Sequence, residues 1–361
     1  MPAKANPTLI FPGGMPLSVD FLRRCQARGQ PVIGASSLPA DPARSLYADW
    51  AYLPMVTDTA FDAALAALIE AKGIIAVFSP NLVVWKYFST HLARIAPQAR
   101  LLNASPAEEA VAGFRQARTR AEQQRDEFEL ACTTTPQPKL SSVQHAAVFR
   151  HAGLIPGMCD DDKIQALCEI MRFVPQGDLV EIGSWWGKSA FVIAMLSRQF
   201  GLGSLLCVDP WQQCHLMQDD AHAMVDQVVA ELDAEEALTI FQMNLAPFGD
   251  GRVNYLRLPS VEAAARYRQS PNIHSVAFGG TGYTGRIALL HIDGNHTLEA
   301  VQADVAAWAD LVVSGGWIIF DDYVWPYGDG PKVTGDAFLF TQPERIATAF
   351  VRGSALFVQL G

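Results

Sequence analysis

The stretch LLHIDGNHTLEAVQADVAAWADLVVSGGWIIFDDY, residues Leu289 to Tyr323, decides the fold. A first apolar run ends at Asp293, an amphipathic segment follows, and a second apolar run ends at Asp321 and Asp322. Runs that are apolar throughout are typical of parallel strands buried between two layers of helices. The stretch therefore predicts a strand, a helix and a second strand, with a carboxylate directly after each strand.

The same alternation continues on both sides of this stretch. Earlier strands are predicted at DLVEIG, SLLCVDPW and VNYLRL, with helices at KSAFVIAMLSRQFG and SVEAAARYRQ. Residues 216–246 are predicted to be largely helical, and the chain is expected to end with a helix at ERIATAF and a strand at ALFVQL. Residues 7–103 alternate strand and helix in the same way. The pattern predicts an α/β fold with parallel sheets and helices on their faces.

A break in this alternation predicts two domains. A polar helical segment begins at residue 106 and runs into CTTTPQPKLSS, whose threonines and prolines are typical of a linker. We expect a small α/β domain over 1–105, a helical segment and linker over 106–140, and a second domain over 141–361.

Composition limits the possible functions. The chain has 361 residues, is 50% hydrophobic and carries a formal net charge of −10. That charge argues against nucleic acid and against an anionic membrane surface as partners. No apolar run reaches the roughly twenty residues of a membrane span, and the first residues lack the apolar core of a secretory signal. We expect a cytoplasmic protein with reduced cysteines, because the six cysteines show no paired spacing: Cys25, Cys132, Cys159, Cys168, Cys207 and Cys214.

The segment VEIGSWWGKSA lies at a predicted turn from strand to helix. Gly183 and Gly187 would let the backbone approach a ligand at the helix N-terminus. The spacing is too short for a phosphate-binding P-loop. An ordinary tight turn is the alternative, but Glu181 within an apolar strand favours a ligand site, because a buried carboxylate needs a partner.

Two further motifs follow along the chain. Asp209 ends a strand, where a carboxylate suits the hydroxyl groups of a ribose, although a turn cap is an equally simple interpretation. GGTGYTG, Gly279 to Gly285, has the GxGxxG spacing but precedes a strand, so we interpret it as a flexible loop between helix and strand.

The carboxylates of the first stretch indicate a metal site. The carboxyl ends of neighbouring parallel strands meet at one edge of a sheet, so Asp293, Asp321 and Asp322 could share a hard cation such as Mg²⁺. His296 would face the same space and could take a proton from a substrate hydroxyl. Helix caps and solvated turns are the alternative for each residue. His291 lies within the strand and is predicted to be a core histidine with its polar atoms satisfied.

LVEIGSWWGKSA, CVDPW and the stretch from His291 to Tyr323 together resemble the class I S-adenosylmethionine-dependent methyltransferases, over about residues 141–361. The nearest branch is the metal-dependent sugar O-methyltransferases of the macrocin O-methyltransferase type. The resemblance implies a Rossmann-like domain with a mostly parallel seven-stranded sheet. It implies Mg²⁺ at Asp293, Asp321 and Asp322, and His296 as the base, with Asp293 beside it in catalysis. The residues that it implies for cofactor binding are Glu181, Gly183, Ser184, Gly187, Ser189, Asp209, Ser260 and Asp293.

Parts of the chain depart from that family. The glycine-rich insert 279–285 is outside the family pattern, and the segment 213–248, where acceptor specificity would be set, matches nothing familiar. Residues 7–103 instead resemble the small domain that precedes the catalytic domain of ATP-grasp ligases. No ATP-grasp catalytic region follows, so this part is expected to bind a substrate, a partner protein or a second copy of the chain.

The predicted function is O-methylation of a small hydroxylated molecule such as a glycoside, with S-adenosylmethionine and Mg²⁺. Two alternatives stay open at this point. One is an enzyme of the cephalosporin-hydroxylase type, which shares the fold and the acidic motifs. The other is a binding or scaffold protein without catalysis, since one fold hosts many functions.

Overall fold

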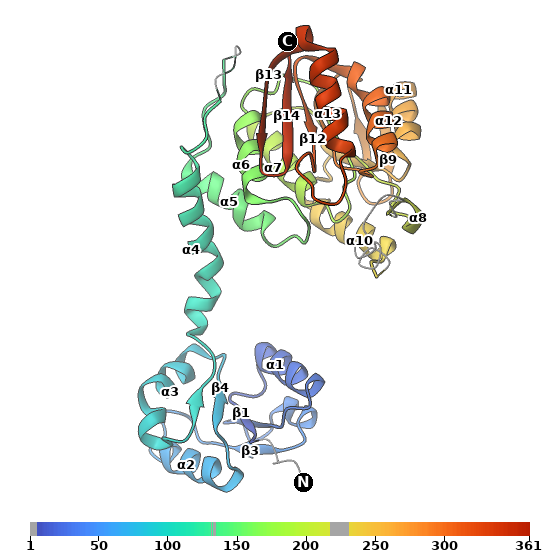
Figure 1. Ribbon diagram of the computed structural model, residues 1–361. Coiled ribbons are helices and arrows are strands. Elements are labelled where there is room, and N and C mark those ends of the chain that lie inside the picture. Colours follow the sequence, from blue (N-terminus) through green and yellow to red (C-terminus); the bar gives the residue numbers. More distant parts are fainter. Residues whose placement is uncertain (1–5, 131, 133–134, 217–230) are drawn as a thin grey trace. The chain divides into compact units, whose positions relative to one another are not determined.

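A computed structural model describes residues 6–130, 132, 135–216 and 231–361. The chain divides into two compact units between Arg115 and Gln116. Helix α4 (Pro106–Gln124) contains this division (Figure 1). Independent folding of the domains expected from the sequence stays a prediction.

The first unit contains a five-stranded parallel sheet, as the alternating pattern predicts. Its strand order is β3-β2-β1-β4-β5. Apolar side chains from the strands and from two helices form its main core, among them Leu9, Phe61 and Phe88. Strand β3 was not predicted, because it has only three residues and leaves no clear alternating pattern. The elements are β1 (Thr8–Ile10), α1 (Pro16–Ala27), β2 (Val32–Ser36), β3 (Trp50–Tyr52), α2 (Phe61–Lys72), β4 (Ala76–Phe78), α3 (Leu82–Ile95) and β5 (Arg100–Leu101).

The second unit contains the predicted seven-stranded, mostly parallel sheet. Its order is β13-β14-β12-β11-β6-β7-β8, and within this sheet only β14 runs antiparallel to the other strands. The Rossmann-like fold expected for this part is therefore confirmed. The strands are β6 (Asp178–Ile182), β7 (Leu205–Val208), β8 (Val253–Leu256), β11 (Ile287–Ile292), β12 (Val312–Phe320), β13 (Ile346–Arg352) and β14 (Ala355–Leu360).

Helices cover both faces of this sheet, so that it is the middle of three layers (Figure 1). Successive strand residues point to opposite faces, and Leu179 and Val180 accordingly belong to different cores. One face packs against α5 (Ser142–Ala152), α6 (Asp161–Ile170), α7 (Lys188–Phe200) and α10 (Ala234–Leu245). The other packs against α11 (Ser260–Gln269), α12 (Leu298–Trp308) and α13 (Gly330–Thr341).

Two local predictions were wrong. The helix predicted at ERIATAF is the edge strand β13, whose residues alternate in exposure and pair with β14, and Phe350 stacks on Phe357. The loop predicted at the glycine-rich insert is in part strand β10 (Gly279–Gly282), which pairs with β9 (Asn272–Ser275). The buried Asn254 fixes this hairpin, since its Nδ2 donates hydrogen bonds to the carbonyls of both strands.

The helix predicted over 216–246 is only partly described. Its last part is helix α10, and α8 (Gln213–Leu216) lies before it, whereas residues 217–230 lie outside the described residues. No helix among the described residues has the length and apolar character needed to cross a bilayer.

Candidate active site

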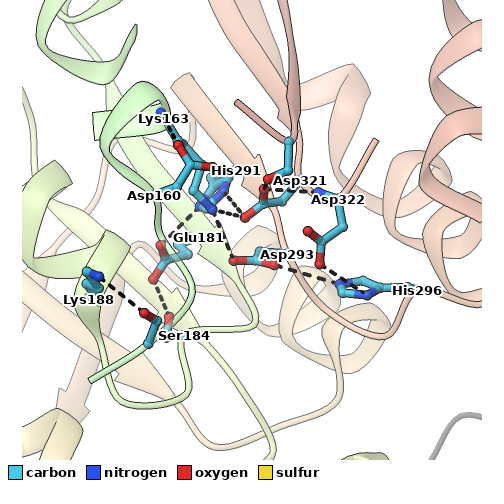
Figure 2. Close-up of polar contacts among 12 residues, drawn as sticks. Asp160, Lys163, Glu181, Ser184, Lys188, His291, Asp293, His296, Asp321 and Asp322 are labelled. Carbon is cyan, nitrogen blue, oxygen red and sulfur yellow. Dashed lines mark hydrogen bonds and ion pairs between the residues drawn. The ribbon is translucent and has the colours of Figure 1, made fainter. Parts of the chain in front are cut away.

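Three neighbouring strands place Glu181, His291 and Asp321 in a row on one face of the sheet (Figure 2). The strand register puts His291 directly beside Glu181. His291 Nδ1 lies 3.0 Å from Glu181 Oε1, and His291 Nε2 lies 3.4 Å from Asp321 Oδ2. His291 is the buried histidine that the sequence predicted, but its partners are two carboxylates of the candidate site.

Lys163 joins this row from helix α6 and is a site residue that the sequence analysis missed. Its side chain is 2% exposed, and its ammonium group donates to Asp321 Oδ2. The same ammonium lies 4.0 Å from Asp293 Oδ2. The first turn of α6 is held in place by Asp160, which accepts a hydrogen bond from the Lys163 backbone N–H at 2.7 Å.

Asp293, His296 and Asp322 form a second group, nearer to solvent. His296 Nδ1 lies 3.4 Å from Asp322 Oδ2, and His296 Nε2 lies 3.8 Å from Asp293 Oδ1. Asp322 has a left-handed backbone (φ 47°), and its side chain is directed toward His296, away from Asp321 (Figure 2). Among the described residues, two sets of three side chains could hold a metal ion: His291, Asp293 and Asp321, and Asp293, His296 and Asp322.

The close packing of these charges shifts their pKa values. Burial and the neighbouring Asp321 carboxylate raise the pKa of Asp293 to about 7. Burial alone would raise the pKa of Asp321, but the Lys163 ammonium and His291 hold it well below its usual range. Burial opposes a charge on His291, yet its contacts with Asp321 and Glu181 raise its pKa to about 10. The pKa of His296 is also raised, because Asp293 and Asp322 outweigh its burial.

Asp209 organises the turn between β6 and α7. Its Oδ2 accepts hydrogen bonds from the backbone N–H groups of Ser184 (3.1 Å) and Trp185 (2.9 Å). Its Oδ1 accepts from the N–H of Trp211 at 2.7 Å. Burial raises the pKa of Asp209, and these three hydrogen bonds partly offset that effect. Two N–H groups of the turn are therefore already paired within the protein.

The two glycines of this turn are required by chain packing. A Cβ atom on Gly183 would lie 1.9 Å from the carbonyl oxygen of Asp293, and one on Gly187 would lie 2.7 Å from Leu245. The sequence analysis explained both glycines by the approach of a ligand. The structure adds a second reason, because the missing side chains make room for other parts of the chain. Ligand binding at this turn stays a prediction.

A cavity of about 660 Å³ connects the turn with the second group of charges. Glu181 is fully buried. Its Oε2 accepts a hydrogen bond at 2.7 Å from Oγ of Ser184, a residue that lines the cavity. Ser260 lies on the opposite wall next to Asp304, a buried residue whose pKa is raised to about 6 by burial. The predicted residues that line the cavity are Gly183, Ser184, Gly187, Ser189, Asp209, Ser260, Asp293, His296, Asp321 and Asp322.

Residues 180–323 match a family model described as a methyltransferase domain. This match covers the turn, most of the residues that line the cavity, and every residue of the two groups of charges except Lys163. Residues 180–323 are therefore assigned to a class I S-adenosylmethionine-dependent methyltransferase domain. These residues include strands β7, β8, β11 and β12 and most of the lining of the cavity.

Solved methyltransferase structures resemble the chain more distantly. The O-methyltransferase NovP is 17% identical, and the alignment covers 54% of this chain and 79% of NovP with a TM-score of 0.38. CalS11, a TDP-rhamnose 3'-O-methyltransferase of calicheamicin biosynthesis, is 16% identical, with 72% and 97% covered and a TM-score of 0.38. An O-methyltransferase from Klebsiella pneumoniae, named as putative, is 15% identical, with 78% and 99% covered and a TM-score of 0.35.

Proposed function

We propose that this protein transfers the methyl group of S-adenosylmethionine to a hydroxyl oxygen of a small molecule, assisted by a divalent cation. One observation carries the proposal. A single cavity has the glycine turn and Asp209 on one wall and His296, Asp293 and Asp322 on another. A methyl donor and a proton acceptor would therefore meet in one cavity, which is the alignment that such a transfer requires.

The donor side is built from the turn after β6. The cofactor, when bound, supplies a methyl group that is already electrophilic. Asp209 keeps the backbone of Ser184 and Trp185 in one conformation, and its carboxylate keeps acceptor capacity for a ribose hydroxyl. Ser260 and Asp304 lie farther along the cavity, where their polar side chains could bind the adenine.

On the acceptor side, His296 is proposed to remove the hydroxyl proton. It is held between Asp293 and Asp322, which fix the orientation of the ring. The Trp325 ring lies 6.1 Å from the His296 ring in an edge-on arrangement. The cavity lining itself contains Trp185 and Trp186, which would offer an apolar surface for the carbon skeleton of the acceptor, so a hydroxylated ring compound such as a glycoside suits the site.

The side chains on this wall also fit a hard divalent cation. Asp293 and Asp322 offer carboxylate oxygens close enough to share one ion, and both face the cavity. Bound Mg²⁺ would supply Lewis acidity that lowers the pKa of the acceptor hydroxyl. His296 would then receive the proton at either ring nitrogen, beside a carboxylate that stabilises the imidazolium form.

The direct test is methyl transfer by the purified full chain. The protein is incubated with S-adenosylmethionine, MgCl₂ and a panel of glycosides and phenols, and S-adenosylhomocysteine and a methyl mass gain are measured by mass spectrometry. Parallel samples are dialysed against EDTA, with and without Mg²⁺ restored. Full activity after EDTA would remove the cation role. No binding of S-adenosylmethionine by calorimetry would overturn the proposed function and favour a binding protein without this chemistry.

A further inference from the structure

Two neighbouring positions in the site could accommodate a positive charge, and they differ in burial and in the groups that already occupy them. The inner position lies among His291, Asp293 and Asp321, and the outer one among Asp293, His296 and Asp322. His291 and Asp321 are buried, whereas all three residues of the outer position are only partly buried. The question is which of them a divalent cation would use.

The inner position already holds the ammonium group of Lys163. This group donates to Asp321 Oδ2 and lies 4.0 Å from Asp293 Oδ2. Lys163 and Asp321 each have a side chain that is 2% exposed, so water does not separate the two charges. A lysine ammonium is a compact positive charge with three donors, and here it fills the place that a metal ion would otherwise take.

Most of the hydrogen-bond acceptor sites of Asp321 are also occupied by contacts within the protein. Its Oδ2 faces Lys163 and His291, and its Oδ1 accepts hydrogen bonds from the Asp322 N–H at 3.0 Å and from Ser354 Oγ at 3.4 Å. A carboxylate has about four lone-pair sites, and three of those on Asp321 accept hydrogen bonds from Lys163, Asp322 and Ser354, with His291 close to the fourth. Asp322, by contrast, has its side chain turned to the cavity beside His296.

We infer that Lys163 is a positioning residue that acts as a built-in cation for Asp321, so that Asp293 and Asp322 are the carboxylates left to bind a divalent metal. Lys163 thereby fixes Asp321 as a structural anion. This inference rests on the proposed cation-assisted methyl transfer, but it concerns metal binding alone. It also departs from the ligand set expected from the sequence, in which Asp321 was a ligand.

The test is Mn²⁺ binding to the full chain, measured by electron paramagnetic resonance with neither S-adenosylmethionine nor acceptor present. The decisive variant is Lys163→Met combined with Asp321→Asn, which removes the buried pair without leaving a lone charge. Its Mn²⁺ affinity is expected to stay within about threefold of wild type, whereas Asp322→Asn is expected to weaken binding about tenfold or more. Circular dichroism melts confirm that each variant is folded.

Two single variants, Lys163→Met and a matched control, test the same inference. Lys163→Met alone frees Asp321 as a third carboxylate and is expected to tighten Mn²⁺ binding about tenfold or more. Lys332→Met is the matched control, because Lys332 is exposed and pairs with Asp336 on α13. A tenfold loss of affinity in the double variant would overturn the inference, because Asp321 would then be a ligand. Absence of Mn²⁺ binding in the folded wild-type protein would overturn it as well. Absence of methyl transfer would overturn only the proposed function.

Discussion

The backbone of Gly183 packs directly against the carbonyl group of Asp293. A Cβ atom at Gly183 would lie 1.9 Å from that oxygen, and Gly183 has a left-handed backbone with φ 79°. The backbone N–H of Asp293 in turn donates to the carbonyl of Ile182 at 2.8 Å. The turn proposed to bind the methyl donor and the loop that carries the acidic residues are thus joined at their backbones, and neither can move alone.

Gly183→Ala is expected to destabilise the fold and not merely to block a ligand. The new methyl group adds an overlap with Asp293 to the strain of a left-handed backbone, for a total of about 3 kcal/mol or more. Gly201→Ala is the matched control, because Gly201 has φ 64° but no atom within 4 Å of its added Cβ. That variant should lose only about 1 kcal/mol. Urea unfolding measures both, and equal losses would contradict the packing argument.

The contact between Glu181 and His291 predicts strong energetic coupling. Both side chains are fully buried, and the two atoms lie 3.0 Å apart. Glu181→Leu or His291→Leu alone should cost about 3–5 kcal/mol, since each removes the nearest polar partner of a fully buried side chain. The double variant should cost less than the sum of the two by about 1–3 kcal/mol. Additive losses in urea unfolding of the three variants would show that the pair acts independently.

The sheet and the strand ends of the site were predictable because their signals are local. Apolar runs that end in Asp209, Asp293 or Asp321 mark buried parallel strands whose carboxyl ends meet at one edge. Strand β13 was mistaken for a helix because an edge strand with short side chains has weak periodicity. The hairpin at the glycine-rich insert depends on the buried Asn254, which is distant in sequence and gives no local signal.

Lys163 shows what sequence patterns leave out. Its partner Asp321 is 158 residues away, and no spacing rule connects them. A signal did exist, because Lys163 lies on the same face of α6 as the buried Leu167 and Ile170, a face that should be apolar. A lysine at such a position must meet an anion, but only the fold identifies which one. The sequence likewise does not show which of Asp321 and Asp322 is free to bind a metal ion. That depends on the left-handed backbone at Asp322, with which its side chain lies beside His296.

Because of the buried His145, we expect the free energy of unfolding to fall in mild acid. His145 is buried on α5, and its Nε2 has no hydrogen-bond partner among the residues that the structure describes. Burial and the nearby Arg125 lower its pKa from 6.5 to about 4. Because the pKa of His145 is lower in the folded state than in the unfolded state, its contribution to the free energy of unfolding is fully present above pH 6.5. It falls away as the pH drops from 6.5 to 4. The shift from 6.5 to about 4 corresponds to about 3 kcal/mol.

His145→Leu should remove this part of the pH dependence, because leucine has no proton to bind. Urea unfolding at pH 7 and pH 4.5 measures the difference between the variant and the wild-type protein. His151→Leu, at an exposed position of the same helix, is the control and should follow the wild type at both pH values. If the His145 variant lost as much stability in acid as the wild type, the histidine would not be the titrating group.

His296→Gln tests the proton acceptor of the proposed reaction. Glutamine keeps a polar side chain between Asp293 and Asp322 but cannot take up a proton, so turnover should fall by about 10²–10⁴-fold. Calorimetry should show unchanged S-adenosylmethionine affinity, because His296 lies on the acceptor wall of the cavity. Added imidazole should restore part of the rate, which a purely structural defect would not allow. His274→Gln, at an exposed position of β9, should keep wild-type turnover. A fully active His296→Gln variant would place the base elsewhere and leave His296 as the partner that orients the two aspartates.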